Sequence, residues 1–211
     1  VAATGERIAA VSAPPRLQLV LDASGSMNRR IGNKRMIDSA KDVLTALIKG
    51  VPDDVQIGLR VYGHRIREGR PGACEDSQQL QPIARLDRGR LLARVQGIAA
   101  LGTTPIAYSL AQVAADLGDA TGPQMVVLVT DGREECGGDP KAAVAALKAK
   151  GLDVRVNIVG FALTDQAAQR QLADAAALTG GTYVNEKDDS ALQDAIDAAM
   201  RVPSEVHASS G

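Results

Sequence analysis

Apolar runs alternate with segments of helical periodicity along most of the chain. Short strand-like runs occupy residues 17–22, 55–62, 77–82, 125–130, 154–161 and 182–185. Between them, apolar residues recur every three or four positions, as on one face of a helix, within residues 36–48, 91–99, 106–117 and 192–200. Two further helices are expected, one starting at Asp139-Pro140 and one over residues 165–179. The alternation predicts an α/β fold: a doubly wound, mostly parallel six-stranded sheet with helices on both faces.

Glycine and proline mark where these elements should end. Gly50 and Pro52 are expected to stop the helix over residues 36–48. Gly180 should close the helix over residues 165–179. Pro82 should end a weak edge strand that begins at Ser77, because proline cannot donate a hydrogen bond to a neighbouring strand.

The length of 211 residues suits one sizeable α/β core. We expect residues 1–15 to form an extended lead-in, residues 16–202 the domain, and residues 203–211 a polar tail or linker. No stretch approaches the roughly 20 apolar residues that a membrane span requires, so direct membrane insertion is not expected.

Composition removes several classes of partner. The chain has 24 basic and 25 acidic residues, a balance that produces no field strong enough to imply nucleic acid or an anionic membrane. One Phe, three Tyr and no Trp leave few aromatic faces on which bases or sugar rings could stack. We therefore expect neither a nucleic-acid-binding protein nor a sugar-stacking lectin.

Three polar segments stand where strands end or helices begin. The first strand ends in Asp22-x-Ser24-x-Ser26, and alternate residues of an extended chain point the same way. The second segment is Gly102-x-Thr104-Pro105, at the start of a helical stretch. The third is the apolar run MVVLVT at residues 125–130, which Asp131 follows directly. These side chains offer only hard oxygens, a set that favours Mg²⁺, with Mn²⁺ or Ca²⁺ as substitutes, over Zn²⁺ or Cu²⁺.

Simpler roles exist for each of these residues. Thr104 before Pro105 is a suitable helix N-cap without any metal. Asp22 and Asp131 could accept hydrogen bonds from loop amides at helix N-termini. The metal interpretation depends on all of the residues meeting at one place.

Together the three segments resemble the metal-ion-dependent adhesion site of von Willebrand factor type A domains. RVYGH at residues 60–64 and ECGGDP at residues 135–140 are similar to the version found in bacterial cell-envelope proteins, although Lys141 stands where that version has a further Cys. The resemblance implies strand order 3-2-1-4-5-6, with the motifs on neighbouring strands at the switch point of the sheet. It also implies Ser24, Ser26 and Thr104 as direct metal ligands, with Asp22 and Asp131 acting mainly through water.

The two cysteines, Cys74 and Cys136, fall in loops expected at the same edge of the sheet. An even pair in loops is typical of a disulfide in an oxidising compartment. Two free thiols, or a zinc site that includes His64, remain alternatives.

The predicted function is a Mg²⁺-dependent protein-binding module of the periplasm or cell exterior, whose ion takes an Asp or Glu carboxylate from the partner. The chain lacks a GxSxG elbow and a phosphate-binding P-loop, so no enzyme activity is expected. A metal-assisted hydrolase with His64 as base is one alternative. An intracellular adaptor that works with an ATPase is another.

A basic run follows the first motif: Arg29, Arg30, Lys34 and Arg35. Such a run is most often a solvated face. Next to a cation site it could instead favour an acidic partner.

Overall fold

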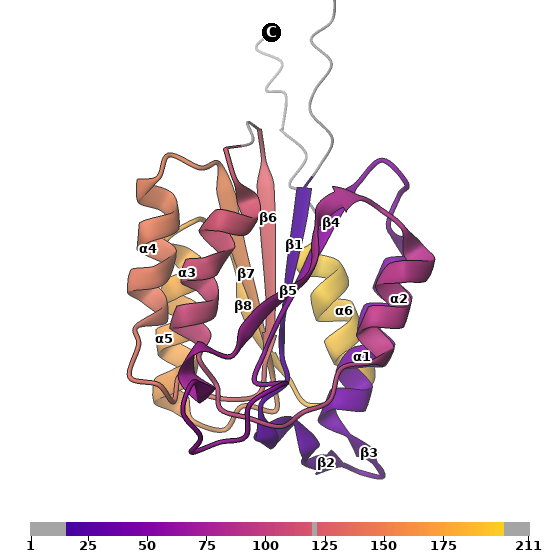
Figure 1. Ribbon diagram of the computed structural model, residues 1–211, viewed down its shortest axis with the longest axis vertical. Coiled ribbons are helices and arrows are strands. Elements are labelled where there is room, and N and C mark those ends of the chain that lie inside the picture. The colour runs from indigo at the N-terminus through magenta and orange to yellow at the C-terminus, as the bar shows by residue number, and fades with distance from the viewer. Residues whose placement is uncertain (1–15, 120–121, 201–211) are drawn as a thin grey trace, which may run out of the picture.

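The computed structural model describes residues 16–119 and 122–200. The lead-in expected at residues 1–15 and the tail expected at residues 203–211 lie outside the described residues, as do the last two residues of the expected domain. Within the described part, one six-stranded sheet separates two layers of helices (Figure 1).

The sheet has the strand order β5-β4-β1-β6-β7-β8, which confirms the expected order and the doubly wound topology. All neighbours are parallel except β4 and β5. The strands are β1 Arg16–Asp22, β4 Gln56–Tyr62, β5 Ser77–Arg85, β6 Gln124–Thr130, β7 Val154–Phe161 and β8 Tyr183–Glu186. A small hairpin, β2 Arg30–Ile31 and β3 Lys34–Arg35, was not predicted from the sequence.

Helices cover both faces of the sheet. The helices are α1 Met36–Gly50, α2 Arg88–Gln96, α3 Ile106–Leu117, α4 Pro140–Ala149, α5 Gln166–Ala177 and α6 Asp189–Ala199. One aliphatic core joins α1, α2 and α6 to the sheet, and a second joins α3, α4 and α5 to its other face. Asp139 caps α4 and Pro140 begins it, as predicted.

Several predicted boundaries were wrong: α1 includes Gly50, α5 ends at Ala177 rather than at residue 179, and the ends of β5 and α2 also differ. Strand β5 does not end at Pro82 but continues to Arg85, because its register against β4 shifts between Ile57 and Leu59 and the proline falls in that irregular stretch of an edge strand. Helix α2 ends at Gln96, followed by Gly97, so that Ile98 is buried from a loop rather than from the helix. None of these differences alters the sheet order.

The carboxyl ends of β1, β4, β6 and β7 meet at one edge of the molecule, at the bottom of Figure 1. The loop after β1 forms a short 3-10 helix there, Gly25–Asn28. The long loop after β4 forms another, Ala73–Glu75. This edge is where open α/β sheets bind their ligands.

Candidate metal centre

The backbone holds the loops after β1 and β4 against the segment that leads into α3. Gly25 N donates to Gly102 O at 2.7 Å, and Gly102 N donates to Gly63 O at 2.7 Å. A Cβ on Gly102 would stand 2.2 Å from the carbonyl oxygen of Ile66, so only glycine fits between the two loops. This contact sets the position of Thr104, two residues later.

Four of the predicted metal-site residues form one hydrogen-bonded group. Ser24 Oγ and Ser26 Oγ lie 3.0 Å apart, and Ser26 Oγ donates to Asp131 Oδ1 at 2.7 Å. Asp22 Oδ1 accepts from Ser24 N at 2.8 Å. The group therefore joins the end of β1 to the end of β6, from residues about a hundred positions apart in the sequence.

Thr104 borders the same group across Gly132. A Cβ built on Gly132 would lie 3.3 Å from Thr104 Oγ1 and 3.8 Å from Ser26 Oγ. Thr104 is not the N-cap of α3, because Pro105 takes that position without a side-chain cap. Its hydroxyl instead donates to Glu135 Oε2 at 3.0 Å, and its amide N–H donates to the same oxygen at 3.2 Å.

The hydrogen bonds leave the hydroxyl oxygens available to a cation. Ser26 and Thr104 each direct their proton to a carboxylate, which can only accept; Ser26 then accepts from Ser24 Oγ, and each of the two hydroxyls keeps at least one lone pair for a cation. Neighbouring oxygens of an octahedral Mg²⁺ at about 2.0–2.1 Å lie about 2.9 Å apart. The distances between oxygens in this group, 2.7 and 3.0 Å, are those of ordinary hydrogen bonds and are compatible with that edge. The residues present thus fit Mg²⁺.

Asp22 is a buried carboxylate with an unfavourable environment in the absence of a cation. Its side chain lies in the interior with the Asp131 carboxylate near by. Burial and the charge of Asp131 raise the pKa of Asp22 to about 7, against the lowering effect of hydrogen bonds from Ser24 and Thr130. A divalent ion at this place would favour the ionised form.

A second set of hydrogen bonds lies behind this group and was not predicted from the sequence. Thr130 Oγ1 donates to Asp22 Oδ2 at 2.6 Å and accepts from the Tyr62 hydroxyl at 3.1 Å. Burial and the charge of Asp22 raise the pKa of Tyr62 well above its usual value, which keeps the phenol as a donor. The sequence feature that could have indicated these hydrogen bonds is Thr130, a polar residue in an apolar strand directly before Asp131.

Three charged residues at the rim were not assigned to the site. The Arg29 guanidinium donates to Asp131 Oδ2 at 2.8 Å. Glu135 accepts a hydrogen bond from the Thr104 hydroxyl, while Glu134 accepts one from Ala107 N at 2.7 Å. Nothing in the local sequence distinguishes these side chains from solvated surface charges, so only the fold identifies them.

The structure joins Cys74 and Cys136 in a disulfide with their Cα atoms 5.5 Å apart. The bond ties the loop after β4 to the loop before α4. In this state neither sulfur is a free thiol or a zinc ligand. Among the described residues, no group of three or more His, Cys, Asp or Glu side chains is arranged to hold a metal ion. A cation in this part of the chain therefore depends on the Ser and Thr hydroxyls.

His64 is directed away from the candidate centre. Its Nε2 lies 3.1 Å from Gln78 Oε1 on β5, and burial lowers its pKa. Within the described residues it forms no hydrogen bond to any of the predicted metal-site residues. This geometry does not support a role for His64 as a base on a metal-bound substrate.

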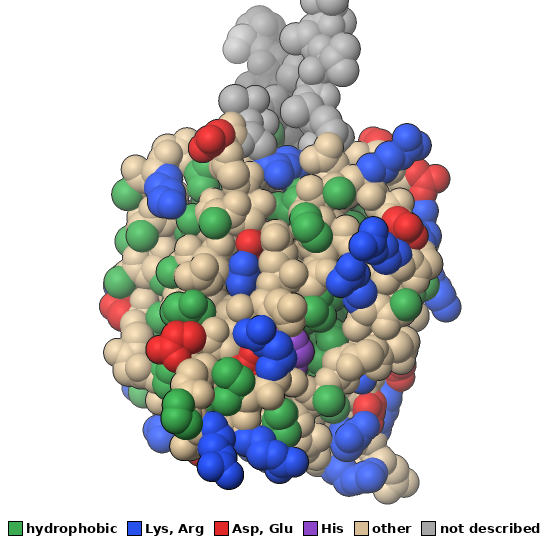
Figure 2. Space-filling model, in the orientation of Figure 1, with side chains coloured by type: hydrophobic (Ala, Val, Ile, Leu, Met, Phe, Trp, Pro, Cys, Tyr) green, Lys and Arg blue, Asp and Glu red, His purple; other side chains and the backbone are tan. Residues whose placement is uncertain are grey.

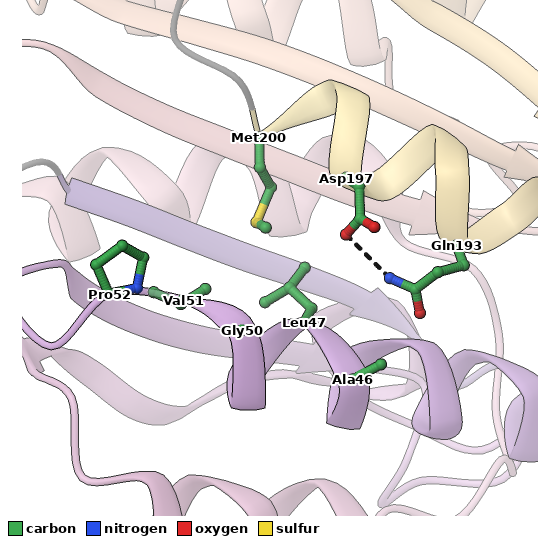
Figure 3. Close-up of a pocket in the computed structure, with 8 residues that line it drawn as sticks. All are labelled: Ala46, Leu47, Gly50, Val51, Pro52, Gln193, Asp197 and Met200. Carbon is green, nitrogen blue, oxygen red and sulfur yellow. Dashed lines mark hydrogen bonds between the residues drawn. The ribbon is translucent and has the colours of Figure 1, made fainter.

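A separate pocket of about 500 Å³ lies between the C-terminal ends of α1 and α6 (Figure 3). Its lining is mostly apolar and includes Leu47, Val51 and Met200. The single carboxylate that it contains, Asp197, accepts a hydrogen bond from Gln193 at 2.9 Å. The pocket offers no set of reactive groups, so the polar group at the sheet edge is the better candidate site.

The chain belongs to the family of von Willebrand factor type A domains, whose sequence model matches residues 17–198. YwmD of Bacillus subtilis strain 168, a protein described as uncharacterized, is 32% identical over 178 residues, which cover 82% of this chain and 79% of YwmD. The pilus adhesin SpaC from Lactobacillus rhamnosus GG is 14% identical, with a TM-score of 0.72 over 90% of this chain and 30% of SpaC.

A third similar protein is proximal thread matrix protein 1 from the mussel byssus. Its structure with a zinc-occupied metal-ion-dependent adhesion site is 15% identical to this chain, with a TM-score of 0.67 over 89% of this chain and 46% of that one. At these identities, the two solved structures show a shared fold. None of the helices in the described ranges has the length and hydrophobicity needed to cross a membrane.

Proposed function

We propose that the protein is a cation-dependent protein-binding module rather than an enzyme. The single observation that carries this proposal is the convergence of hydroxyl and carboxylate oxygens from separate loops at the switch point of the sheet. Asp22, Ser24, Ser26, Thr104 and Asp131 would hold the ion. Because their donors are hard oxygens, the ion is Mg²⁺, with Mn²⁺ or Ca²⁺ as substitutes.

The partner contributes an Asp or Glu carboxylate to the ion. Mg²⁺ seeks six oxygen ligands, and the hydroxyls that face it carry no charge. A carboxylate from outside would supply both a ligand and negative charge. The fold is shared with a pilus adhesin and a byssus matrix protein, which is consistent with a role in protein interaction.

The basic surroundings of the site suit such a partner. Lys and Arg side chains gather along the lower edge of Figure 2, the edge where the carboxyl ends of the strands and the β2–β3 hairpin lie in Figure 1. The loops of this edge carry the exposed residues Arg29, Arg67, Arg70 and Arg133, beside exposed Glu68, Glu75 and Glu135. The arginines would attract an acidic segment and speed its association.

The module works in the periplasm or outside the cell. Disulfides persist in oxidising compartments and are rare in the cytosol, so the Cys74–Cys136 bond supports this location. It argues against the intracellular adaptor, whose cysteines would be kept reduced.

The test is capture of proteins from the envelope fraction of the native source on the immobilised module. Binding of a specific partner should fail in EDTA and recover with Mg²⁺ or Mn²⁺. Thr104→Ala should abolish capture, whereas Thr104→Ser, which keeps the hydroxyl, should retain it. Circular dichroism must show that both variants are folded. A partner whose affinity is the same in EDTA and with Thr104→Ala would contradict the proposal.

A further inference from the structure

The Arg29 side chain places a positive charge on a proposed metal-site residue. Its Nη2 donates to Asp131 Oδ2 at 2.8 Å, and its Nε donates to the backbone oxygen of Ser26 at 3.3 Å. The other oxygen of Asp131 accepts from Ser26 Oγ. Both carboxylate oxygens are therefore engaged, one by the site and one by a guanidinium.

The two partners of this ion pair differ in exposure. The Asp131 side chain is 0% exposed, while that of Arg29 is 56% exposed. A buried carboxylate thus obtains its counter-charge from a side chain that remains largely in solvent. Such a partner can leave only when another cation takes its place, because a buried carboxylate left unpaired is costly.

The ion pair between Arg60 and Asp116 differs from the pair between Arg29 and Asp131 in geometry and in exposure. Arg60 uses Nε and Nη2 together on the two oxygens of Asp116, at 2.6 and 2.7 Å, and both side chains are buried. That bidentate pair joins β4 to α3 and has no route to solvent. The pair between Arg29 and Asp131 is held through one nitrogen and is open on one side, as expected of a contact that has to be exchanged.

We propose that Arg29 and the metal ion exchange places at Asp131, and that the released guanidinium binds a second acidic side chain of the partner. This inference rests on the proposed function and specifies its partner: a segment with two neighbouring carboxylates, one for the ion and one for Arg29. A guanidinium beside a divalent cation is repelled from Asp131. Its planar pair of donors matches a carboxylate. Because Arg29 follows Ser26 by three residues, it stays next to the ion after release.

The first experiment measures Mg²⁺ affinity by isothermal titration calorimetry at constant ionic strength. Arg29→Gln removes the competitor and should tighten Mg²⁺ binding at least about threefold. Arg30→Gln is the matched control: it removes the same charge from the next residue, whose guanidinium donates to the backbone of Asn33 instead. If both variants change the affinity equally, the exchange is wrong. If the unaltered protein binds no Mg²⁺, the proposed function fails as well.

The second experiment tests the partner class with two synthetic peptides at saturating Mg²⁺. They have the same length and differ in one residue, with a Glu-Gly-Glu or a Glu-Gly-Gln core. By NMR titration, the unaltered protein and Arg30→Gln should prefer the diacidic peptide at least about threefold, and Arg29→Gln should lose the preference. Binding of both peptides with equal affinity to the unaltered protein would overturn the role of Arg29 while leaving the proposed function intact. Failure of both peptides to bind would count against the proposed function itself.

Discussion

Asp22 and Asp76 are two buried carboxylates at the same edge of the sheet, and their environments are opposite. Asp76 accepts from the amide N–H groups of Arg65 and Ile66 and from the Arg65 guanidinium, at 2.7–2.8 Å. Although burial alone would raise it, these donors hold the pKa of Asp76 below its usual value. Asp22 accepts only neutral donors, and its pKa is raised to about 7 by burial and by Asp131.

The difference shows that Asp76 is a structural carboxylate, whereas Asp22 has no counter-charge among its hydrogen-bond donors. Asp76 fixes the start of the loop after β4, and its charge is balanced within that loop. Asp22 has a charge that its own hydrogen bonds do not balance. A buried, uncompensated carboxylate is costly, and under the proposed function the bound cation would balance it.

The largest expected effect comes from removing the disulfide that holds the same loop as Asp76. Replacing Cys74 and Cys136 together by Ala opens a closed segment with a sequence separation of 62 residues. In the chain-entropy model this lowers the free energy of unfolding by about 4 kcal/mol. Urea denaturation measures the loss. Mg²⁺ should still stabilise the variant if the metal centre is independent of this bond, and an unchanged unfolding midpoint would contradict the prediction.

Metal addition should stabilise the protein through Asp22. At about one hundred times its dissociation constant, Mg²⁺ should raise the free energy of unfolding by about 2.7 kcal/mol. Asp22→Asn should remove this gain, because it deletes the carboxylate that would face the ion. The measurement is thermal unfolding with EDTA and with Mg²⁺. Asp54→Asn, an exposed change away from the sheet edge, should keep the full response.

Asp76→Asn should lower the stability of the protein and leave its response to Mg²⁺ intact, whereas Asp22→Asn should remove that response. It removes a charged acceptor from two amides and a guanidinium, at a cost of about 2 kcal/mol in the free energy of unfolding. The stabilisation by Mg²⁺ should remain. Glu75→Gln, at the exposed neighbouring position, is the matched control and should change little. If Asp76→Asn is as stable as the unaltered protein, Asp76 does not have the structural role assigned to it.

A pH dependence of opposite sign also distinguishes the two carboxylates. The raised pKa of Asp22 means that the folded state in EDTA holds a proton that the unfolded state has lost, so stability falls as pH rises from about 4 to about 7. The slope is at most about 1.4 kcal/mol per pH unit. The lowered pKa of Asp76 contributes stability that is lost as pH falls below about 4.

Urea midpoints measured across this range in EDTA and in Mg²⁺ separate the two groups. Mg²⁺ should flatten the pH dependence of stability that is due to Asp22. It should leave unchanged the loss of stability at acid pH that is due to Asp76. A slope between pH 5 and pH 7 that persists in Asp22→Asn would assign it to another group.

The sequence by itself determined the alternation of strands and helices, and its motifs identified the family, whose resemblance implied the sheet order. Apolar periodicity is a local property, and the first strand ends in a motif whose residues are neighbours in the chain, Asp22, Ser24 and Ser26. Because parallel strands present their carboxyl ends at one edge, the local motifs were sufficient to predict where the polar side chains meet.

Tertiary structure alone decided which charges complete that edge. Arg29 reaches Asp131, Glu135 accepts a hydrogen bond from Thr104, and Thr130 links Asp22 to Tyr62. These partners lie between 31 and 108 positions apart in the chain. No periodicity or spacing encodes such a pairing, because it depends on where two loops fold against each other and on which charge the buried carboxylate can reach.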